Sequence, residues 1–156
     1  MFITHAKRRT TAVTVIVCIS EGGGMLFNKR RQSRDKAVIK DIAKISADSV
    51  LFISDFSAKL LAESDISAIA VSNPLDSAGD EDAVFVENLP ITAFKKKIDR
   101  FIIYKWNQKY PTDTRLDFDP QKEGMSLIES IDFVGNAHEK ITRETWMRTD
   151  YSLLPN

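Results

Sequence analysis

The chain has 156 residues, 43% of them hydrophobic, with 22 basic and 22 acidic side chains. This length fits one domain with one continuous core, and the balanced charge gives no reason to expect nucleic acid or an anionic membrane as the main partner. A single cysteine, Cys18, excludes an internal disulfide and is typical of a protein of the reducing cytoplasm. No stretch approaches the roughly 20 apolar residues that span a bilayer. We therefore expect a cytoplasmic protein without a membrane span.

The N-terminal part of the chain predicts a buried strand, a flexible turn and an amphipathic helix. Val13–Ile19 is almost wholly apolar and rich in valine and isoleucine, which is typical of a strand covered on both faces. Gly22–Gly24 can take a positive φ and let the backbone approach a ligand, although a surface turn explains them equally well. From Asp35 to Ile45 the apolar residues recur every three or four positions, so we expect a helix with one buried face.

Strands and helices continue to alternate after this helix. Val50–Ile53 is a short apolar run, and Ser54 or the next aspartate can cap a second helix. Ile66–Val71 and Ala83–Val86 have the composition of strands, and Asn73–Asp82 between them is acidic and contains proline and glycine, as loops do.

The C-terminal part of the chain predicts a short helix from Thr92, a strand over Phe101–Tyr104 and a closing hairpin. The two hairpin segments, Ser126–Phe133 and Lys140–Met147, flank a short loop. The fold class is therefore α/β, in three layers, with a mostly parallel twisted sheet, helices on both sides and a C-terminal antiparallel hairpin. We expect one domain over 1–156, with 1–10 as a flexible extension and 149–156 as a tail.

Several local strings resemble the dihydrofolate reductase family, over most of the chain from about Val13 to Arg148. The resemblance implies that family's fold, NADPH as a cofactor, a small heterocyclic or nucleotide-like ligand and, where catalysis is retained, hydride transfer. The matching features are Gly24-Met25 and Asn28 before a helix begun by Asp35, Val50-Leu51-Phe52 before the second helix, Tyr110-Pro-Thr-Asp113-Thr114, and Asn136-Ala-His138 through Arg148.

The resemblance also implies a set of site residues. On the substrate side these are Val15, Asp35, Ile39, Val86 and Thr114, and on the cofactor side Gly23, Gly24, Ser54, Glu87 and Asn88. The cofactor side departs from the family's pattern, because Ile53-Ser54 stands in place of Gly-Arg and Glu87-Asn88 in place of Gly-Gly. A carboxylate there repels a diphosphate, and a Cβ prevents the close approach that glycine permits.

Asp35 is the candidate catalytic residue. At a helix start inside a pocket, desolvation can raise its pKa so that it serves a heterocycle as proton donor or hydrogen-bond acceptor. An aspartate before an apolar-periodic stretch also commonly acts only as a helix N-cap. Thr114 is the matching hydroxyl expected across the pocket, although such residues also stabilise turns.

The densest basic cluster of the chain is Lys29, Arg30, Arg31 and Arg34. Arginine can grip phosphate through two hydrogen bonds, so this loop could hold an anion or a partner, and a solvated surface loop explains it equally well. Trp106, with a tyrosine on either side, could form an aromatic platform or pack in the core.

We expect no metal site. The strings MLFNKRRQSRD, FVEN, YKWN and HEKIT are similar to small bacterial proteins labelled ribonuclease Z. A zinc-dependent phosphodiesterase needs clustered histidines and aspartates, and this chain has only His5 and His138. The residues therefore do not support that label.

Two functions remain open from the sequence. The first is a divergent reductase-like domain that binds a small ligand between Asp35, the first strand and Thr114. The second is a non-catalytic interaction protein that uses the 29–34 loop to bind a protein or a nucleic acid. The sequence pattern does not indicate an oligomeric state.

Overall fold

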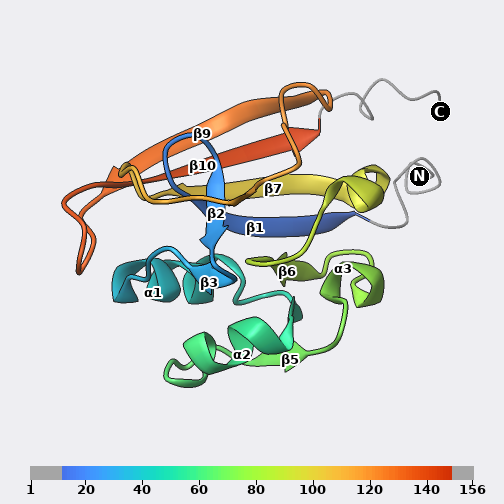
Figure 1. The fold of residues 1–156 in the computed structure, drawn as a ribbon. Coiled ribbons are helices and arrows are strands. Elements are labelled where there is room, and N and C mark those ends of the chain that lie inside the picture. Colours follow the sequence, from blue (N-terminus) through green and yellow to red (C-terminus); the bar gives the residue numbers. More distant parts are fainter. Residues whose placement is uncertain (1–11, 149–156) are drawn as a thin grey trace, which may run out of the picture.

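The computed structural model describes residues 12–148. The extension and the tail expected at 1–10 and 149–156 lie outside the described residues. The main sheet has seven strands in the order β5-β4-β6-β1-β7-β10-β9, and a small second sheet has the order β3-β2-β8 (Figure 1). The strands of the main sheet are β1 (Val13–Ile19), β4 (Leu51–Ile53), β5 (Ala68–Ala70), β6 (Ala83–Phe85), β7 (Ile98–Lys105), β9 (Met125–Phe133) and β10 (Ile141–Arg148).

Short helices and the second sheet cover the main sheet. The second sheet consists of β2 (Gly24–Phe27), β3 (Arg30–Arg31) and β8 (Thr114–Arg115). The helices are α1 (Lys36–Ile45), α2 (Asp55–Ala62), α3 (Pro74–Ser77) and the 3-10 helix η2 (Thr92–Lys97). Strands β5, β4, β6, β1 and β7 are parallel, and β10 and β9 continue the sheet in antiparallel pairing. The predicted fold class is confirmed.

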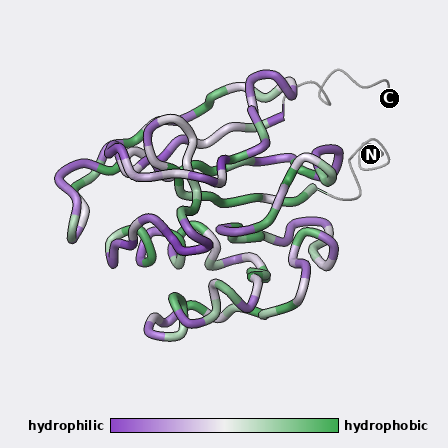
Figure 2. Tube along the Cα trace, in the orientation of Figure 1, coloured by the Kyte–Doolittle hydropathy of each residue, from purple (hydrophilic) through white to green (hydrophobic). Residues whose placement is uncertain are grey.

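Strand β1 lies between two hydrophobic clusters, one on each face of the sheet. Val13, Val15 and Val17 belong to the cluster shared with α3 and β2, whereas Ile16 belongs to the cluster shared with α1 and α2. Figure 2 shows the hydrophobic stretches gathered along the central strands. The nearly continuous apolar run of β1 therefore reflects burial on both faces, as predicted.

Helix α1 has the predicted amphipathic pattern. Val38 and Ile42 are buried, and Asp35 is the N-cap residue, with its side chain accepting a hydrogen bond from the backbone N–H of Ala37 at 2.8 Å. Ser54 is the N-cap residue of α2, but its side chain makes no capping hydrogen bond.

Three predicted elements differ in detail from the structure. β5 is shorter than the predicted strand, and the predicted loop at 73–82 contains the short helix α3, because Pro74 suits the first position of a helix. The helix that begins at Thr92 is a 3-10 helix, and Ile98 already belongs to β7.

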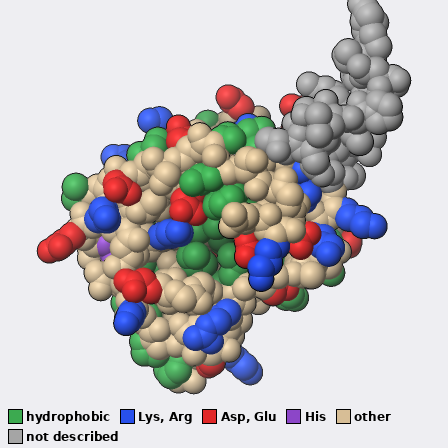
Figure 3. All heavy atoms as spheres, turned by 90° about the horizontal axis from the view of Figure 1, so that it is seen from above, with side chains coloured by type: hydrophobic (Ala, Val, Ile, Leu, Met, Phe, Trp, Pro, Cys, Tyr) green, Lys and Arg blue, Asp and Glu red, His purple; other side chains and the backbone are tan. Residues whose placement is uncertain are grey.

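The C-terminal hairpin forms one edge of the main sheet. Its outer strand, β9, exposes Leu127, Ile128 and Ile131. Seen from the β9–β10 side (Figure 3), hydrophobic side chains are exposed among charged ones. No helix within residues 12–148 is long and apolar enough to cross a membrane.

Candidate functional site

Asp35 lies at the start of α1 with its side chain fully buried. Its Oδ1 accepts hydrogen bonds from the backbone N–H groups of Ala37 (2.8 Å) and Asn136 (2.7 Å). Its Oδ2 accepts from the backbone N–H of Ala137 (2.7 Å) and lies 2.8 Å from Nδ1 of His138. The carboxylate therefore joins the start of α1 to the β9–β10 loop, about 100 residues further along the chain.

These hydrogen bonds determine the charge state of Asp35. Burial acts to raise its pKa, but the bonds from the His138 ring and from three backbone N–H groups outweigh burial and lower the pKa from 3.8 to about 2. A carboxylate that accepts several N–H donors is strongly favoured in its charged form. The predicted rise of the Asp35 pKa is therefore wrong, and this residue is not a proton donor near neutral pH.

His138 is the centre of a polar cluster beside Asp35. Its Nε2 lies 2.9 Å from Oγ of Ser33 and 3.1 Å from the hydroxyl of Tyr110. Its ring stacks on Trp106, with 4.7 Å between the ring centroids. Both Trp106 and His138 are buried, so the cluster is fixed by packing as well as by hydrogen bonds.

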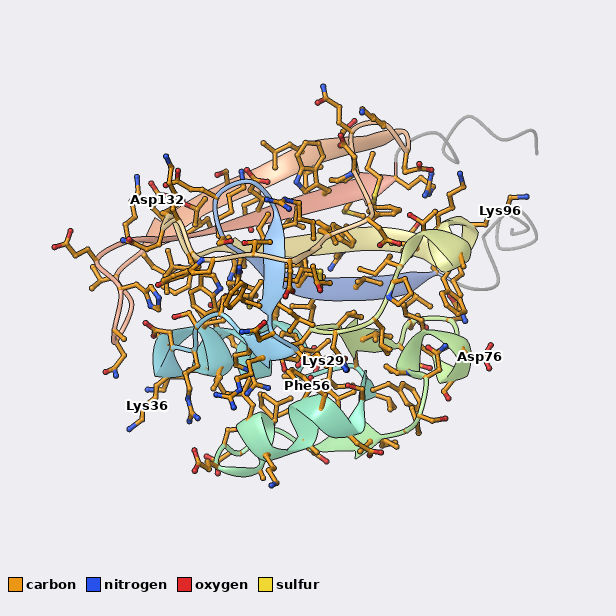
Figure 4. All side chains as sticks on the ribbon, viewed as in Figure 1. Lys29, Lys36, Phe56, Asp76, Lys96 and Asp132 are labelled. Carbon is orange, nitrogen blue, oxygen red and sulfur yellow. The ribbon has the colours of Figure 1, made fainter. Side chains whose placement is uncertain are left out.

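Glu87 follows β6 and forms a second, partly buried polar cluster. Its carboxylate accepts two hydrogen bonds from the guanidinium of Arg31, both at 2.7 Å, and a third from the Ser57 hydroxyl at 2.7 Å. The Arg31 guanidinium also lies 4.9 Å from the ring centroid of Phe56. Lys29, in the β2–β3 turn, and Phe56, near the start of α2, mark the two sides of this contact in Figure 4. The β2–β3 segment is thus held against the chain that follows β6 by a bidentate ion pair, and against α2 by the contact of Arg31 with Phe56.

The space beside Asp35 is filled with side chains. The cavity that Cys18, Ser33, Asp35, Glu87 and Trp106 help to line has a volume of about 10 Å³, which is at most the space of one water molecule.

Larger grooves formed by the described residues are open to solvent, and two of them include a chain neighbour of Ser33. A groove of about 650 Å³ lies between α1, α2 and the β9–β10 loop, and it is lined by Arg34, Lys36, Ala37, Ile39, Lys40, Ala43, Leu60, Glu63, Ser64, Asp65, Val134, Gly135 and Asn136. We call it the α1–α2 groove. A groove of about 530 Å³, which we call the β2–β3 groove, is lined by Phe27, Asn28, Arg30, Arg31, Gln32, Tyr110 and Pro111. Both have the volume of a small-molecule site.

The structure brings together only two of the expected substrate-side residues, since Asp35 and Ile39 both line the small cavity. Val15 and Val86 are buried in the cluster on the face of α3 and β2, whereas Ile39 packs on the opposite face and lines the α1–α2 groove. Thr114 is exposed in β8, and its hydroxyl donates to the Asp113 carboxylate at 3.2 Å. Neither Val15 nor Thr114 lines the small cavity beside Asp35.

The expected cofactor-side residues form two separate groups. Ser54 donates to the side chain of Asn88 at 3.1 Å, next to the Glu87 cluster. Gly23 lies in the turn between β1 and β2 with a φ of 79°. At Gly24 an added Cβ would collide with side chains of Ser20, Gln32 and Thr112, so close packing explains that glycine. The structure therefore accounts for both glycines without a ligand.

The basic loop is divided between paired and unpaired cations. Arg31 is bound to Glu87, and Arg34 lies 3.1 Å from the exposed carboxylate of Glu63. Lys29 and Arg30 are exposed and form no ion pair with another described residue. Within the described part of the chain, no group of three or more histidine, cysteine, aspartate or glutamate residues could hold a metal ion.

Sequence reasoning missed Ser33, Ser57 and the role of His138. His138 is 103 positions from Asp35 and 105 from Ser33, so no local spacing indicates their contact. The sequence shows only that His138 is one of two histidines and that Asp35 precedes an apolar-periodic helix, and neither feature specifies their contact.

The site is thus that of an α/β domain in which polar clusters fill the carboxyl ends of the parallel strands, where ligands of such folds commonly bind.

No protein-family model matches the chain, and no curated protein sequence matches it. Among solved structures, the dihydrofolate reductase from Enterococcus faecalis complexed with NADP(H) and RAB-propyl matches with a TM-score of 0.61. The match covers 90% of this chain and 98% of the reductase at 9% identity. The chain therefore has a dihydrofolate reductase-like fold.

Proposed function

We propose that this protein is a small-molecule-binding domain on a dihydrofolate reductase-like scaffold that has lost NADPH-dependent hydride transfer. The observation that carries the proposal is the Glu87 cluster. Arg31 and Ser57 occupy the carboxylate oxygens of Glu87 at the position where the resemblance implies a glycine pair. A partly buried carboxylate that is already paired leaves neither the positive potential nor the space that a dinucleotide diphosphate needs. The residues present therefore do not fit NADPH.

The Asp35 cluster supports the same proposal. All four of the hydrogen bonds that this carboxylate accepts come from within the chain, and the adjoining cavity of about 10 Å³ has no room for a heterocycle. A ligand that needed this acid would first have to break a buried, charge-assisted network.

The α1–α2 groove is the proposed binding site. Ile39 and Leu60 contribute apolar side chains to its lining. Lys36 and Lys40 contribute cations at the α1 side, opposite the carboxylates of Glu63 and Asp65 after α2. Lys36 points outward from the start of α1 in Figure 4. An apolar lining beside exposed ammonium groups suits a flat heterocycle that carries a carboxylate or a phosphate.

Calorimetric titration tests this assignment with folate, a nucleoside monophosphate and NADPH. We expect saturable binding of an anionic heterocycle that weakens about tenfold in Lys40→Glu, which corresponds to about 1.4 kcal/mol. Lys96→Glu, an exposed cation on η2, is the matched control and should bind like the wild type. Saturable binding of NADPH, or the absence of any binding, would refute the proposal.

A second function is supported by the unpaired end of the basic loop. Lys29 and Arg30 are exposed near Phe27, which is 41% exposed, and Arg30 and Phe27 line the β2–β3 groove. Asn28 and Lys29 are the two central residues of the β2–β3 hairpin turn, and their positive φ angles of 52° and 60° place the Lys29 side chain on this turn. Binding of a polyanion here should fall steeply with added salt and should be lost in the Lys29→Ala, Arg30→Ala double variant. Unchanged binding in that variant would exclude this loop.

A further inference from the structure

Ser33, His138 and Asp35 form a chain of hydrogen bonds in the order found in serine hydrolases. Ser33 Oγ lies 2.9 Å from His138 Nε2, and His138 Nδ1 lies 2.8 Å from Asp35 Oδ2. Such a triad is recognised by geometry and roles, because it occurs on unrelated folds. We propose that Ser33 is a catalytic nucleophile for acyl transfer, with His138 as its general base, and that its substrates are esters of small carboxylic acids. This inference goes beyond ligand binding in the α1–α2 groove and does not depend on it.

The environment of Asp35 determines which nitrogen of His138 carries the proton. The carboxylate already accepts backbone N–H groups from both Asn136 and Ala137, so it serves as an ionised acceptor for the imidazole as well. In the neutral imidazole, Nδ1 therefore carries the hydrogen and Nε2 keeps its lone pair toward the Ser33 hydroxyl. This is the tautomer that a general base for serine requires.

Solvent exposure increases along the triad from Asp35 to Ser33. The side chains of Asp35 and His138 are 0% and 4% exposed, whereas Ser33 is half-buried at the surface end of the cluster. A buried base beside a partly exposed nucleophilic residue suits such catalysis, because the base is held in place while the substrate approaches from the solvent. Because the cavity next to Ser33 is only about 10 Å³, the acyl group must be small or must lie on the solvent side.

The residue after Ser33 offers a donor for the developing oxyanion. In many serine hydrolases this position supplies a backbone N–H to the oxyanion hole. The N–H of Arg34 donates no hydrogen bond to another described residue. The Arg34 side chain lines the α1–α2 groove, and Gln32, on the other side of Ser33, lines the β2–β3 groove. Ser33 therefore lies in the chain between the two open grooves.

The reaction consists of two balanced half-reactions. Ser33 Oγ bonds to the ester carbonyl carbon while its proton passes to His138 Nε2; the bond to the leaving alkoxide then breaks, and the alkoxide takes that proton. Water attacks the acyl-serine in the second half, gives its proton to Nε2, and releases the carboxylic acid as the proton returns to Ser33 Oγ. No oxidant, reductant or metal takes part.

Tyr110 provides an internal test of the triad. Its hydroxyl lies 3.1 Å from the same Nε2 and competes with Ser33 for the single lone pair of the neutral imidazole. Removing this hydroxyl in Tyr110→Phe should leave Ser33 as the sole hydroxyl at Nε2. The reactivity of Ser33 should then rise or stay the same.

The experiment is labelling of the full chain with a fluorophosphonate probe, followed by intact mass measurement and peptide mapping. The Ser33 oxygen displaces fluoride from phosphorus, so one adduct per chain is expected, located on Ser33. Its rate should exceed that of other serines by about 100-fold, the lower range for a positioned general base. Ser33→Ala should abolish the adduct, and Ser57→Ala, whose hydroxyl binds a carboxylate instead of a histidine, should retain it.

Each alternative outcome overturns the proposal. Absence of an adduct on the folded wild type, verified by circular dichroism, excludes an activated serine. Adducts spread over several serines, or retained in Ser33→Ala, assign the reactivity elsewhere. A rate in Tyr110→Phe at least tenfold below that of the wild type would show that Nε2 serves the tyrosine and not Ser33.

Discussion

Replacing Asp35 with asparagine removes one charge from the buried carboxylate and leaves the side-chain volume almost unchanged. Lowering its pKa from 3.8 to about 2 corresponds to about 2 kcal/mol of preference for the charged form, at about 1.4 kcal/mol per pKa unit. The amide oxygen can still accept the N–H groups of Ala37 and Asn136, but the amide NH₂ then faces the N–H of Ala137 and Nδ1–H of His138. These two contacts between hydrogen-bond donors add about 1 kcal/mol or more to the loss of stability.

We therefore expect Asp35→Asn to lower the free energy of unfolding by about 3 kcal/mol, and the melting temperature by about 6–12 °C for a chain of this size. Urea denaturation at pH 7 measures this, followed by the fluorescence of Trp106, which stacks on His138. Asp132→Asn is the matched control, because that exposed carboxylate accepts one hydrogen bond from Thr142, and it should cost less than about 0.5 kcal/mol. A loss below 1 kcal/mol for Asp35→Asn would refute the reasoning.

The pH dependence of the stability of the wild type and of Asp35→Asn tests the direction of the Asp35 pKa shift. The pKa of Asp35 is lower in the folded chain than in the unfolded chain. The stability that its ionisation contributes to the folded state is therefore complete above about pH 4 and is lost as the pH falls through about 2. The stability difference between wild type and Asp35→Asn should therefore shrink by about 2 kcal/mol between pH 5 and pH 2. A difference that is constant over this range would mean that the carboxylate charge is not what these hydrogen bonds stabilise.

Two further variants test the packing around the two clusters. In Gly135→Ala the new Cβ would lie 2.6 Å from Asp35 Oδ2, so we expect a loss of about 1–3 kcal/mol in chemical denaturation, whereas Gly79→Ala, with its nearest neighbour at 3.8 Å, should be nearly neutral. Equal effects of the two would contradict this packing. Glu87→Gln weakens a mostly buried ion pair and should lower the free energy of unfolding by about 1–3 kcal/mol. Glu63→Gln, in an exposed pair, should lower it by less than about 0.5 kcal/mol. Thermal unfolding compares the two variants, and the reverse order would show that the Glu87 cluster does not hold the β2–β3 segment.

Much of the fold could be predicted from local patterns. The continuous apolar run Val13–Ile19 indicated burial on both faces, and the spacing of Val38 and Ile42 indicated one buried helix face. These signals are local because strand and helix periods are short. The boundaries of α3 and η2 were less accessible, since short helices depend on tertiary contacts more than on propensity.

The candidate site was predicted only in part. Asp35 was placed correctly at a helix start, and the N-cap interpretation is confirmed by its bond to the Ala37 N–H. Its further partners come from a loop about 100 positions away, so the direction of the pKa change could not be read from the neighbouring residues. Likewise, Glu87 was predicted to repel a diphosphate, but nothing in the sequence indicated that Arg31 would neutralise it.

The sequence by itself determined the chain order of the main-sheet strands and of α1 and α2, the two-sided burial of β1 and the departure from glycine at Glu87 and Asn88. These features depend on residue type and on spacings of a few positions. Only the tertiary structure decided that Asp35 faces His138 and not an open pocket, and that His138 in turn reaches Ser33. Hydrogen bonds between residues that far apart depend on how the sheet brings α1 and the β9–β10 loop together, which no local pattern encodes.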